Sequence, residues 1–157
     1  MRVGIGYDIH RLKKGRKLRL GGVSVPHTHG LTGHSDGDAL IHAVVDALLG
    51  AAGLGDIGAH FSDKDTRFRN ADSRLFLRAA REMLKKKKLR VVNVDSVIIT
   101  EKPNLLKYKN LMSQAMAREL ELPASRVNVK AKTNEGLGVV GKGKALACYA
   151  VASLKGK

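Results

Sequence analysis

The sequence predicts an α/β (α+β) fold, with a single sheet of about four to five strands and helices packed on one face. Two observations predict it. Short segments of alternating or β-branched apolar residues, typical of strands, alternate with longer segments in which apolar residues recur at helical spacing. The length of 157 residues and the hydrophobic content of 43% suit one domain with a substantial core, so we expect a single domain spanning residues 1–157.

The N-terminal part of the chain is expected to form strands and a loop. Residues 2–12, RVGIGYDIHRL, have the composition of a strand. Residues 16–27 are typical of two short strands joined at Gly21 and Gly22, because paired glycines favour a tight turn. Residues 27–38 are rich in Gly, Thr, Ser and Asp, which predicts a loop.

Two helices are predicted next. Residues 36–53 carry apolar side chains at helical spacing, and Asp38 suits the start of this helix because its carboxylate can accept a first-turn N–H. Residues 53–68 contain too many Gly and Asp for a regular element. Residues 71–89 have an amphipathic pattern that predicts a second helix.

The C-terminal half continues the pattern. Residues 92–100 and 126–133 are typical of strands, and residues 104–122 of a helix that Pro123 ends. Residues 144–154, KALACYAVASL, are small and apolar, and fit either a strand or a short helix.

The charge balance is strongly basic, with a formal net charge of +15. Such a charge raises nucleic-acid binding as an alternative function. However, the densest run, Lys85–Lys88, closes a predicted helix, where cations favour the helix C-terminus. The chain also has 4% aromatic residues and no Trp, so it offers few platforms for stacking bases. A solvated lysine-rich surface that attracts a small anionic substrate is the favoured interpretation.

Compartment signals favour the cytoplasm. A single cysteine, Cys148, excludes an internal disulfide and agrees with a reducing environment. No apolar run approaches about 18 residues and no signal peptide is visible, so we expect no membrane partner.

Asp8 and His10 occupy alternate positions in the first predicted strand, so their side chains point to the same face. His42 lies in the first predicted helix with Asp38 and Asp46 one turn away on either side, which predicts a polar stripe opposite the apolar face. If this stripe faces the strand, Asp8, His10 and His42 supply three zinc ligands and leave a fourth position open. The alternative to a metal site is a surface histidine and an ordinary strand-end aspartate, which would have the same spacing.

A second group of polar residues lies in the predicted loop 53–68. Asp56, Asp63 and Asp65 are carboxylates among backbone N–H donors, a combination that suits a polyol or a hydrated cation. An Asx-rich turn would use the same residues.

A third group follows the strand 126–133. The glycines of residues 136–141 match G-x-G-x-x-G, but too few residues follow them for the βαβ unit of a dinucleotide-binding fold. A more modest interpretation is that Lys132, Thr133 and the glycine amides hold phosphates, with Glu135 carrying a magnesium ion that bridges them.

Together, five segments resemble the 2-C-methyl-D-erythritol 2,4-cyclodiphosphate synthase family. They are GYDIHRL (6–12), HSDGDALIHAVVDALLGAAGLGDIGAHFSDKD (34–65), ADSRLFLR (71–78), NVDSVIITEKPNL (93–105) and VNVKAKTNEGLG (127–138). The resemblance covers nearly the whole chain. It implies conversion of 4-diphosphocytidyl-2-C-methyl-D-erythritol 2-phosphate into the cyclic diphosphate and CMP, in the non-mevalonate isoprenoid pathway, by a homotrimer with active sites between subunits.

The resemblance also implies metal ions and site residues. Zn²⁺ would be held by Asp8, His10 and His42, and Mg²⁺ or Mn²⁺ by Glu135 together with the nucleotide phosphates. The residues implied to stabilise the transition state are His34 and Thr133. The residues implied to bind substrate are Asp8, His10, His34, Ser35, Asp56, Ile57, Gly58, Phe61, Ser62, Asp63, Lys64, Asp65, Thr100, Lys102, Pro103, Asn104, Leu105, Leu106, Lys132, Thr133, Asn134, Glu135, Val139 and Lys142.

In some members of that family an apolar cavity on the trimer axis holds an isoprenoid diphosphate. The matching positions here are Tyr7, Val139 and Lys142, with valine in place of an aromatic residue and lysine in place of an arginine. Lysine lacks the planar fork that grips a phosphate at two points, so we expect weak, anion-driven binding on the axis.

The implied reaction agrees with the residue types. The attacking 2-phosphate is already an anion at pH 7, so no strong general base is needed, and no Ser-His-Asp or Cys-His arrangement is apparent. Positioning and charge neutralisation must then supply the catalysis. Two alternatives remain open at this point: a zinc-dependent phosphoesterase with water as nucleophile, and a basic nucleic-acid-binding module. We expect a cytidine diphosphate-linked small-molecule substrate and no nucleic-acid partner.

Overall fold

A five-stranded mixed sheet forms one layer of the molecule in the computed structural model, which describes residues 1–62 and 64–156. The strands lie in the order β4-β1-β7-β5-β6, in which β5 and β6 pair in parallel and the other neighbours antiparallel. Their bounds are β1 Arg2–Lys14, β4 His29–Leu31, β5 Leu89–Ile99, β6 Val127–Lys132 and β7 Ala145–Gly156. The predicted α+β fold with about four to five strands is confirmed.

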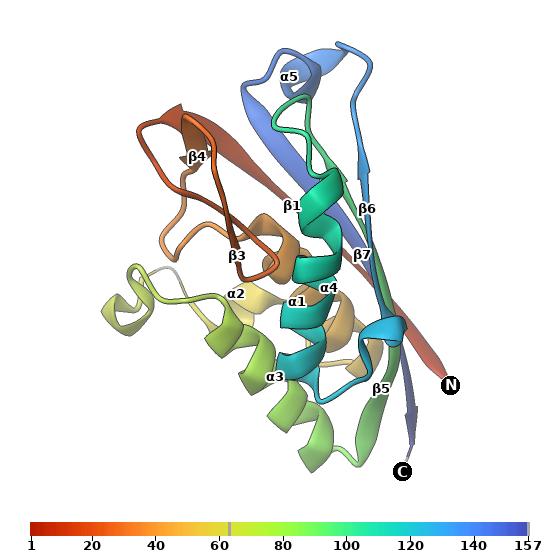
Figure 1. Cartoon of the computed structure of the whole chain (residues 1–157). Coiled ribbons are helices and arrows are strands. Elements are labelled where there is room, and N and C mark those ends of the chain that lie inside the picture. The colour runs from red at the N-terminus through yellow and green to blue at the C-terminus, as the bar shows by residue number, and fades with distance from the viewer. Residues whose placement is uncertain (63, 157) are drawn as a thin grey trace.

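The long helices cover one face of this sheet, and the short helix α5 lies at one end of it (Figure 1). The long ones are α1 (Ala39–Ala52), α3 (Arg74–Lys86) and α4 (Lys109–Leu120), and the short ones are α2 (Ile57–His60) and α5 (Gly138–Gly141). Three single 3₁₀ turns lie at Thr66–Phe68, Leu106–Tyr108 and Ala124–Arg126. A separate two-stranded hairpin, β2 (Leu18–Leu20) and β3 (Val23–Val25), packs beside α1 and α4.

Helix α1 is the centre of the core, because 11 of its 14 residues are buried. It packs directly on β1 and β7. Two glycines of β1 permit the approach: a Cβ on Gly4 would lie 2.1 Å from the carbonyl oxygen of Ala47, and one on Gly6 would lie 1.9 Å from that of Ala43. The helix backbone therefore rests against the strand itself.

The expected polar stripe on α1 requires a correction. Asp38 does begin the helix, as predicted, and accepts the N–H of Ile41. It is fully buried, however, and helix α1 has no wide solvated face. The reason is that α1 lies between the sheet, α3 and the hairpin. Asp38 contacts the hairpin turn, His42 contacts β1, and Asp46 contacts the start of α2.

Other elements differ from prediction mainly at loops. Strand β4 lies in the predicted loop 27–38, because three residues that pair with the end of β1 show no periodicity of their own. The ambiguous segment 144–154 is strand β7, which lies at the centre of the sheet. Helix α4 is preceded by a 3₁₀ turn instead of beginning at residue 104.

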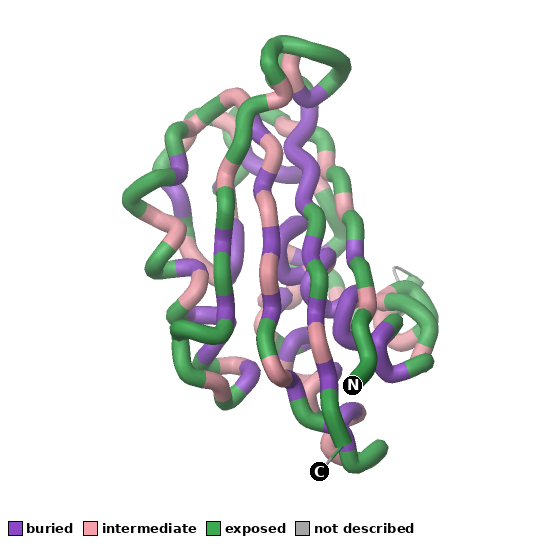
Figure 2. The backbone as a smooth tube through the Cα atoms, turned by 90° about the vertical axis from the view of Figure 1, so that its right-hand side faces the viewer, coloured by how far each residue is buried: buried purple, intermediate pink, exposed green. Residues whose placement is uncertain are grey.

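The second face of the sheet is not covered by helices (Figure 2). Along β1, exposed residues alternate with half-buried or buried residues that face α1, and along β7 the exposed Tyr149 and Val151 alternate with buried residues. Of the helices in the described residues, none is long and apolar enough to cross a membrane.

Candidate functional site

Asp8, His10 and His42 meet at one point between β1 and α1. Asp8 Oδ2 lies 3.0 Å from Nδ1 of His10 and 3.0 Å from Nδ1 of His42. One ligand atom from each residue lies within 4.8 Å of the others, the arrangement that a metal ion requires. The predicted opposition of the strand pair and the helix histidine is therefore confirmed, and the three residues fit a divalent metal.

His10 provides an independent test of that fit. Its Nδ1 is buried and makes no well-directed hydrogen bond, the one such side-chain atom among residues 1–62 and 64–156. A buried polar atom without a partner is unfavourable. A metal ion bound between His10 and Asp8 would satisfy it, so the donor set is better suited to a cation than to protein contacts alone.

The electrostatics also favour a cation. Burial alone would raise the pKa of Asp8, but contact with the rings of His10 and His42 holds that pKa at about 2, so the carboxylate is ionised. Burial by itself would lower the pKa of His42, but hydrogen bonding to Asp8 outweighs it and raises that pKa. A proton or a metal ion between Asp8 and the rings is thus strongly stabilised.

A cavity of about 220 Å³ opens over this cluster. All three phenylalanines of the chain line it, and the rings of Phe61 and Phe76 are 4.7 Å apart. Predicted substrate-binding residues that also line the cavity are Asp8, His10, His34, Ser35, Ile57, Gly58 and Phe61. An apolar wall beside a charged floor is typical of a small-molecule site.

The loop that carries Ile57 and Gly58 is attached to α1. Asp46 Oδ1 accepts the N–H of Ile57 at 2.7 Å. Asp56 begins α2 by accepting the N–H of Ala59, and it remains exposed. Asp46, the third residue of the predicted polar stripe, thus fixes the start of α2 relative to α1.

Other polar residues of this loop form hydrogen bonds with one another. Asp65 accepts two side-chain N–H groups of Arg67 and its backbone N–H, so its carboxylate is paired in the isolated chain. Ser62 Oγ accepts the N–H of Lys64. Asp63, also predicted to bind substrate, lies outside the described residues.

A second cavity, also of about 220 Å³, lies between the end of β5, the start of α4 and the end of β6. Glu101 lines this cavity and accepts the N–H of Asn134 at 2.7 Å. This hydrogen bond attaches the loop after β6 to the loop after β5. The predicted substrate-binding residues that line it are Thr100, Pro103, Asn104, Leu105, Leu106, Lys132 and Thr133. It shares no residue with the first cavity.

Glu135 stands at the rim of this region. Its Oε1 accepts the hydroxyl of Thr133 at 2.9 Å, and its side chain is exposed. Lys142 lines a third cavity with the exposed Lys102, and Val139 is 51% exposed on α5. These residues therefore do not join the Asp8–His10–His42 cluster within one chain.

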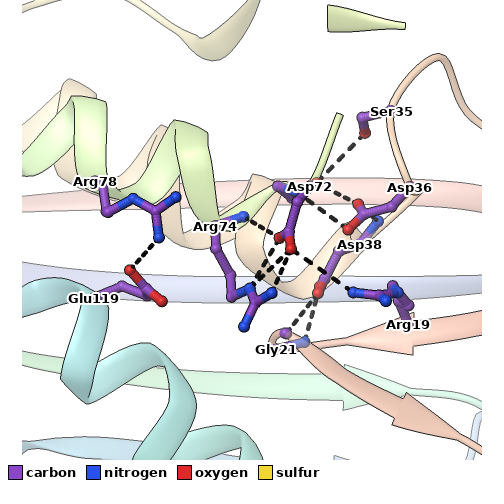
Figure 3. Close-up of polar contacts among 11 residues, drawn as sticks. Arg19, Gly21, Ser35, Asp36, Asp38, Asp72, Arg74, Arg78 and Glu119 are labelled. Atoms are coloured by element: carbon purple, nitrogen blue, oxygen red, sulfur yellow. Dashed lines mark hydrogen bonds and ion pairs between the residues drawn. The ribbon is translucent and has the colours of Figure 1, made fainter. Parts of the chain in front are cut away.

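Several residues around the cluster were not predicted. Phe68 and Phe76 line the first cavity, and Ser73 and Asp36 form hydrogen bonds that extend outward from His42. Figure 3 shows Asp36 beside Asp38, between the loop and the start of α3. The sequence segments that hold Asp36 and Ser73 carry the family resemblance, but no periodicity links two positions 37 residues apart.

Comparisons with known proteins agree with this geometry. The model of the YgbB family matches residues 1–155. The 2-C-methyl-D-erythritol 2,4-cyclodiphosphate synthase of Desulfosudis oleivorans is 55% identical over 152 residues, which cover 97% of this chain and 90% of that protein. A solved 2C-methyl-D-erythritol-2,4-cyclodiphosphate synthase in a CDP-bound form matches with a TM-score of 0.90 and 38% identity, over 98% of this chain and 100% of that one.

A longer protein also contains this fold. The bifunctional IspDF from Campylobacter jejuni matches with a TM-score of 0.96 and 39% identity. The match covers 99% of this chain and 42% of that one, so this chain spans less than half of that protein.

Proposed function

The chain belongs to the YgbB family, and from that premise we propose how its residues carry out the reaction of its curated relatives. Its activity is that of a 2-C-methyl-D-erythritol 2,4-cyclodiphosphate synthase, an enzyme of isoprenoid biosynthesis. In the reaction, an oxygen of the substrate's 2-phosphate attacks the β-phosphorus of the diphosphocytidyl group. The bond from that phosphorus to CMP breaks, and CMP leaves. The observation that carries this proposal is the Asp8–His10–His42 cluster beneath a cavity lined by residues implied to bind substrate.

We propose zinc as the metal of the cluster. Two imidazole nitrogens and one carboxylate oxygen are ligands that zinc accepts, with a fourth position left for substrate. Glu135 is proposed to hold Mg²⁺ or Mn²⁺, because these ions are commonly held by one or two carboxylates together with substrate phosphates. Bound divalent cations would neutralise the phosphate oxygens that must approach one another.

His34 and Thr133 are proposed to stabilise the transition state by donating hydrogen bonds to phosphate oxygens. His34 lines the first cavity and Thr133 the second. Lys132, exposed next to Thr133, adds a positive charge. Since the nucleophile is already ionised, the protein has to position and neutralise two anionic groups, and these donors are suited to that task.

A homotrimer with shared sites is proposed for the same reason. The CDP-bound relative binds cytidine diphosphate, and we propose that the second cavity of one subunit receives this part of the substrate. Because the two cavities of one chain have no residue in common, a neighbouring subunit would bring a second cavity to the metal cluster. The exposed apolar residues on the open face of the sheet support such an assembly. A cytoplasmic location stays a prediction.

The test is a product assay. The protein, supplied with zinc and magnesium, is incubated with 4-diphosphocytidyl-2-C-methyl-D-erythritol 2-phosphate, and the products are followed by phosphorus NMR. We expect CMP and the cyclic diphosphate in equal amounts. His42→Ala should keep its fold, lose bound zinc and turn over more than about a hundredfold slower, because one of three protein ligands is gone. Open-chain phosphates instead of the cyclic product would contradict the assignment and indicate a phosphoesterase.

A further inference from the structure

Ser73 stands where a helix-capping residue belongs but does not cap its helix. It precedes α3, and its side chain makes no capping hydrogen bond. Serine at this position normally accepts an N–H of the first helical turn. Ser73 is fully buried, and its hydroxyl contacts His42 and Asp36 instead. Its hydroxyl is therefore directed at the metal cluster.

The direction of each hydrogen bond follows from the number of donors. Ser73 Oγ lies 2.5 Å from Asp36 Oδ1, and a carboxylate can only accept, so the single hydroxyl hydrogen points to Asp36. The same oxygen lies 2.9 Å from His42 Nε2 and must accept from it. Nε2 therefore carries a proton. In the metal-free protein Nδ1 also donates to Asp8, and a metal ion that took the place of this Nδ1 proton would leave the Nε2–H on Ser73. That Nδ1 is the atom facing Asp8.

Asp36 is held firmly in this orientation. Besides the hydroxyl, it accepts the backbone N–H of Ser73 at 3.2 Å and that of Asp38 at 3.2 Å. Its own N–H donates to the carbonyl oxygen of Ala71. The carboxylate thus links the loop before α1 to the start of α3, the two segments that flank His42.

Ser35 also contacts His42, but it cannot replace Ser73 in orienting the ring. Its Oγ lies 3.1 Å from His42 Nε2 and 3.4 Å from Ser73 Oγ. It accepts the N–H of Gly37, but no carboxylate contact fixes the direction of its hydroxyl hydrogen among the described residues. Ser73 is the shorter contact to His42 and the one tied to a carboxylate.

We propose that Ser73 and Asp36 are positioning residues for the metal: the Asp36–Ser73–His42 relay keeps the ring proton on Nε2 and aims Nδ1 at the site shared with Asp8 and His10. This inference rests on the proposed metal role of His42. Metal-bound histidines generally donate their second N–H to an outer acceptor, and losing that acceptor weakens metal binding about 10- to 100-fold.

Zinc affinity of the purified protein, measured by competition with a chromogenic chelator, tests the relay without relying on turnover. Ser73→Ala should weaken zinc binding about 10- to 100-fold. Ser96→Ala is the matched control, since Ser96 is also buried and donates to the carbonyl oxygen of Asn128 far from the cluster. Its zinc affinity should stay within about twofold of the parent, because its hydroxyl touches no metal ligand.

Asp36→Asn supplies a second variant of nearly the same shape. Its amide can donate to Ser73 Oγ, which frees the hydroxyl hydrogen to point at His42 Nε2 and favours the wrong ring tautomer. We expect a loss of zinc affinity like that of Ser73→Ala. The double variant should lose little more than either single one, because residues of one relay are not additive.

Nitrogen-15 NMR of the metal-free protein gives the readout that a purely structural role would not move. His42 should be protonated at Nε2 in the parent and should lose this preference in Ser73→Ala. Three results would overturn the proposal. They are unchanged zinc affinity in Ser73→Ala, equal losses in Ser73→Ala and Ser96→Ala, and unchanged protonation of His42 Nε2 in Ser73→Ala. If the parent itself bound no zinc, the proposed metal centre would fail together with the relay.

Discussion

Asp38 joins two backbone segments by accepting three N–H groups through a single carboxylate. Its Oδ1 accepts the N–H of Ile41 at 3.0 Å and that of Gly21 at 2.8 Å, and its Oδ2 accepts that of Gly22 at 2.7 Å (Figure 3). Because the side chain is fully buried, water cannot replace a lost bond. The carboxylate therefore holds the turn of the β2–β3 hairpin against the start of α1, one turn before His42.

Asp38→Asn should therefore destabilise the fold although the side chain keeps its size. An amide has one acceptor oxygen, and its NH₂ would face a glycine N–H. We expect the free energy of unfolding, measured by urea denaturation, to fall by about 1–3 kcal/mol. Asp56→Asn is the control: Asp56 is exposed and caps α2 with Oδ1 alone, which asparagine also provides, so the change should stay within about 0.5 kcal/mol. Equal losses in the two variants would contradict this role of Asp38.

At the scale of elements, the contact between β1 and α1 places the metal ligands. Gly4 and Gly6 face the helix on the same side of β1 as Asp8 and His10, since alternate residues share a face. The absence of Cβ atoms lets α1 lie close enough for His42 to reach Asp8. The two glycines thus determine how close His42 comes to Asp8, as well as how α1 packs on β1.

Gly6→Ala tests this contact. Its Cβ would lie 1.9 Å from the backbone oxygen of Ala43, so strand and helix would have to separate. We expect a loss of about 3 kcal/mol or more in the free energy of unfolding, together with weaker zinc binding. Gly50→Ala, on α1 itself, has no neighbour nearer than 3.9 Å and should stabilise by about 0.5–1 kcal/mol. A folded Gly6→Ala protein of parental stability and zinc affinity would show that the close approach is dispensable.

Periodicity explains which parts of the site could be predicted from sequence. Asp8, His10 and His42 lie in regular elements whose faces can be read from a repeat of two or of 3.6 residues, so their meeting was predictable. Strand β4 was not predictable, because its three residues form a strand only through their pairing with β1. Ser73 looked like an ordinary helix start, and its contact with Asp36 depends on tertiary packing that no local pattern encodes.

At the scale of the whole molecule, the uncovered sheet face is unusually apolar for a surface. Val3 is 65% and Ile5 is 70% exposed on β1, and Tyr149 and Val151 are 41% and 42% exposed on the neighbouring strand β7. Tyr7 and Tyr149 contact each other across the two strands with ring centres 4.7 Å apart and ring planes tilted by 40°. A contiguous apolar face of this kind favours contact with further copies of the chain, as in the proposed trimer.

Mixing two inactive proteins tests whether sites are shared. His42→Ala removes a metal ligand from the first cavity, and Lys132→Ala removes a positive charge from the second. Each variant alone should therefore be nearly inactive. If each site combines His42 of one subunit with Lys132 of its neighbour, random reassembly of equal amounts restores about a quarter of the sites, because each position is intact half of the time. Activity after unfolding and refolding the mixture should therefore approach about a quarter of the parent's, while each variant refolded alone stays inactive. If one chain supplied both residues, every site would carry a defect, and no activity would return despite subunit exchange shown by mass spectrometry.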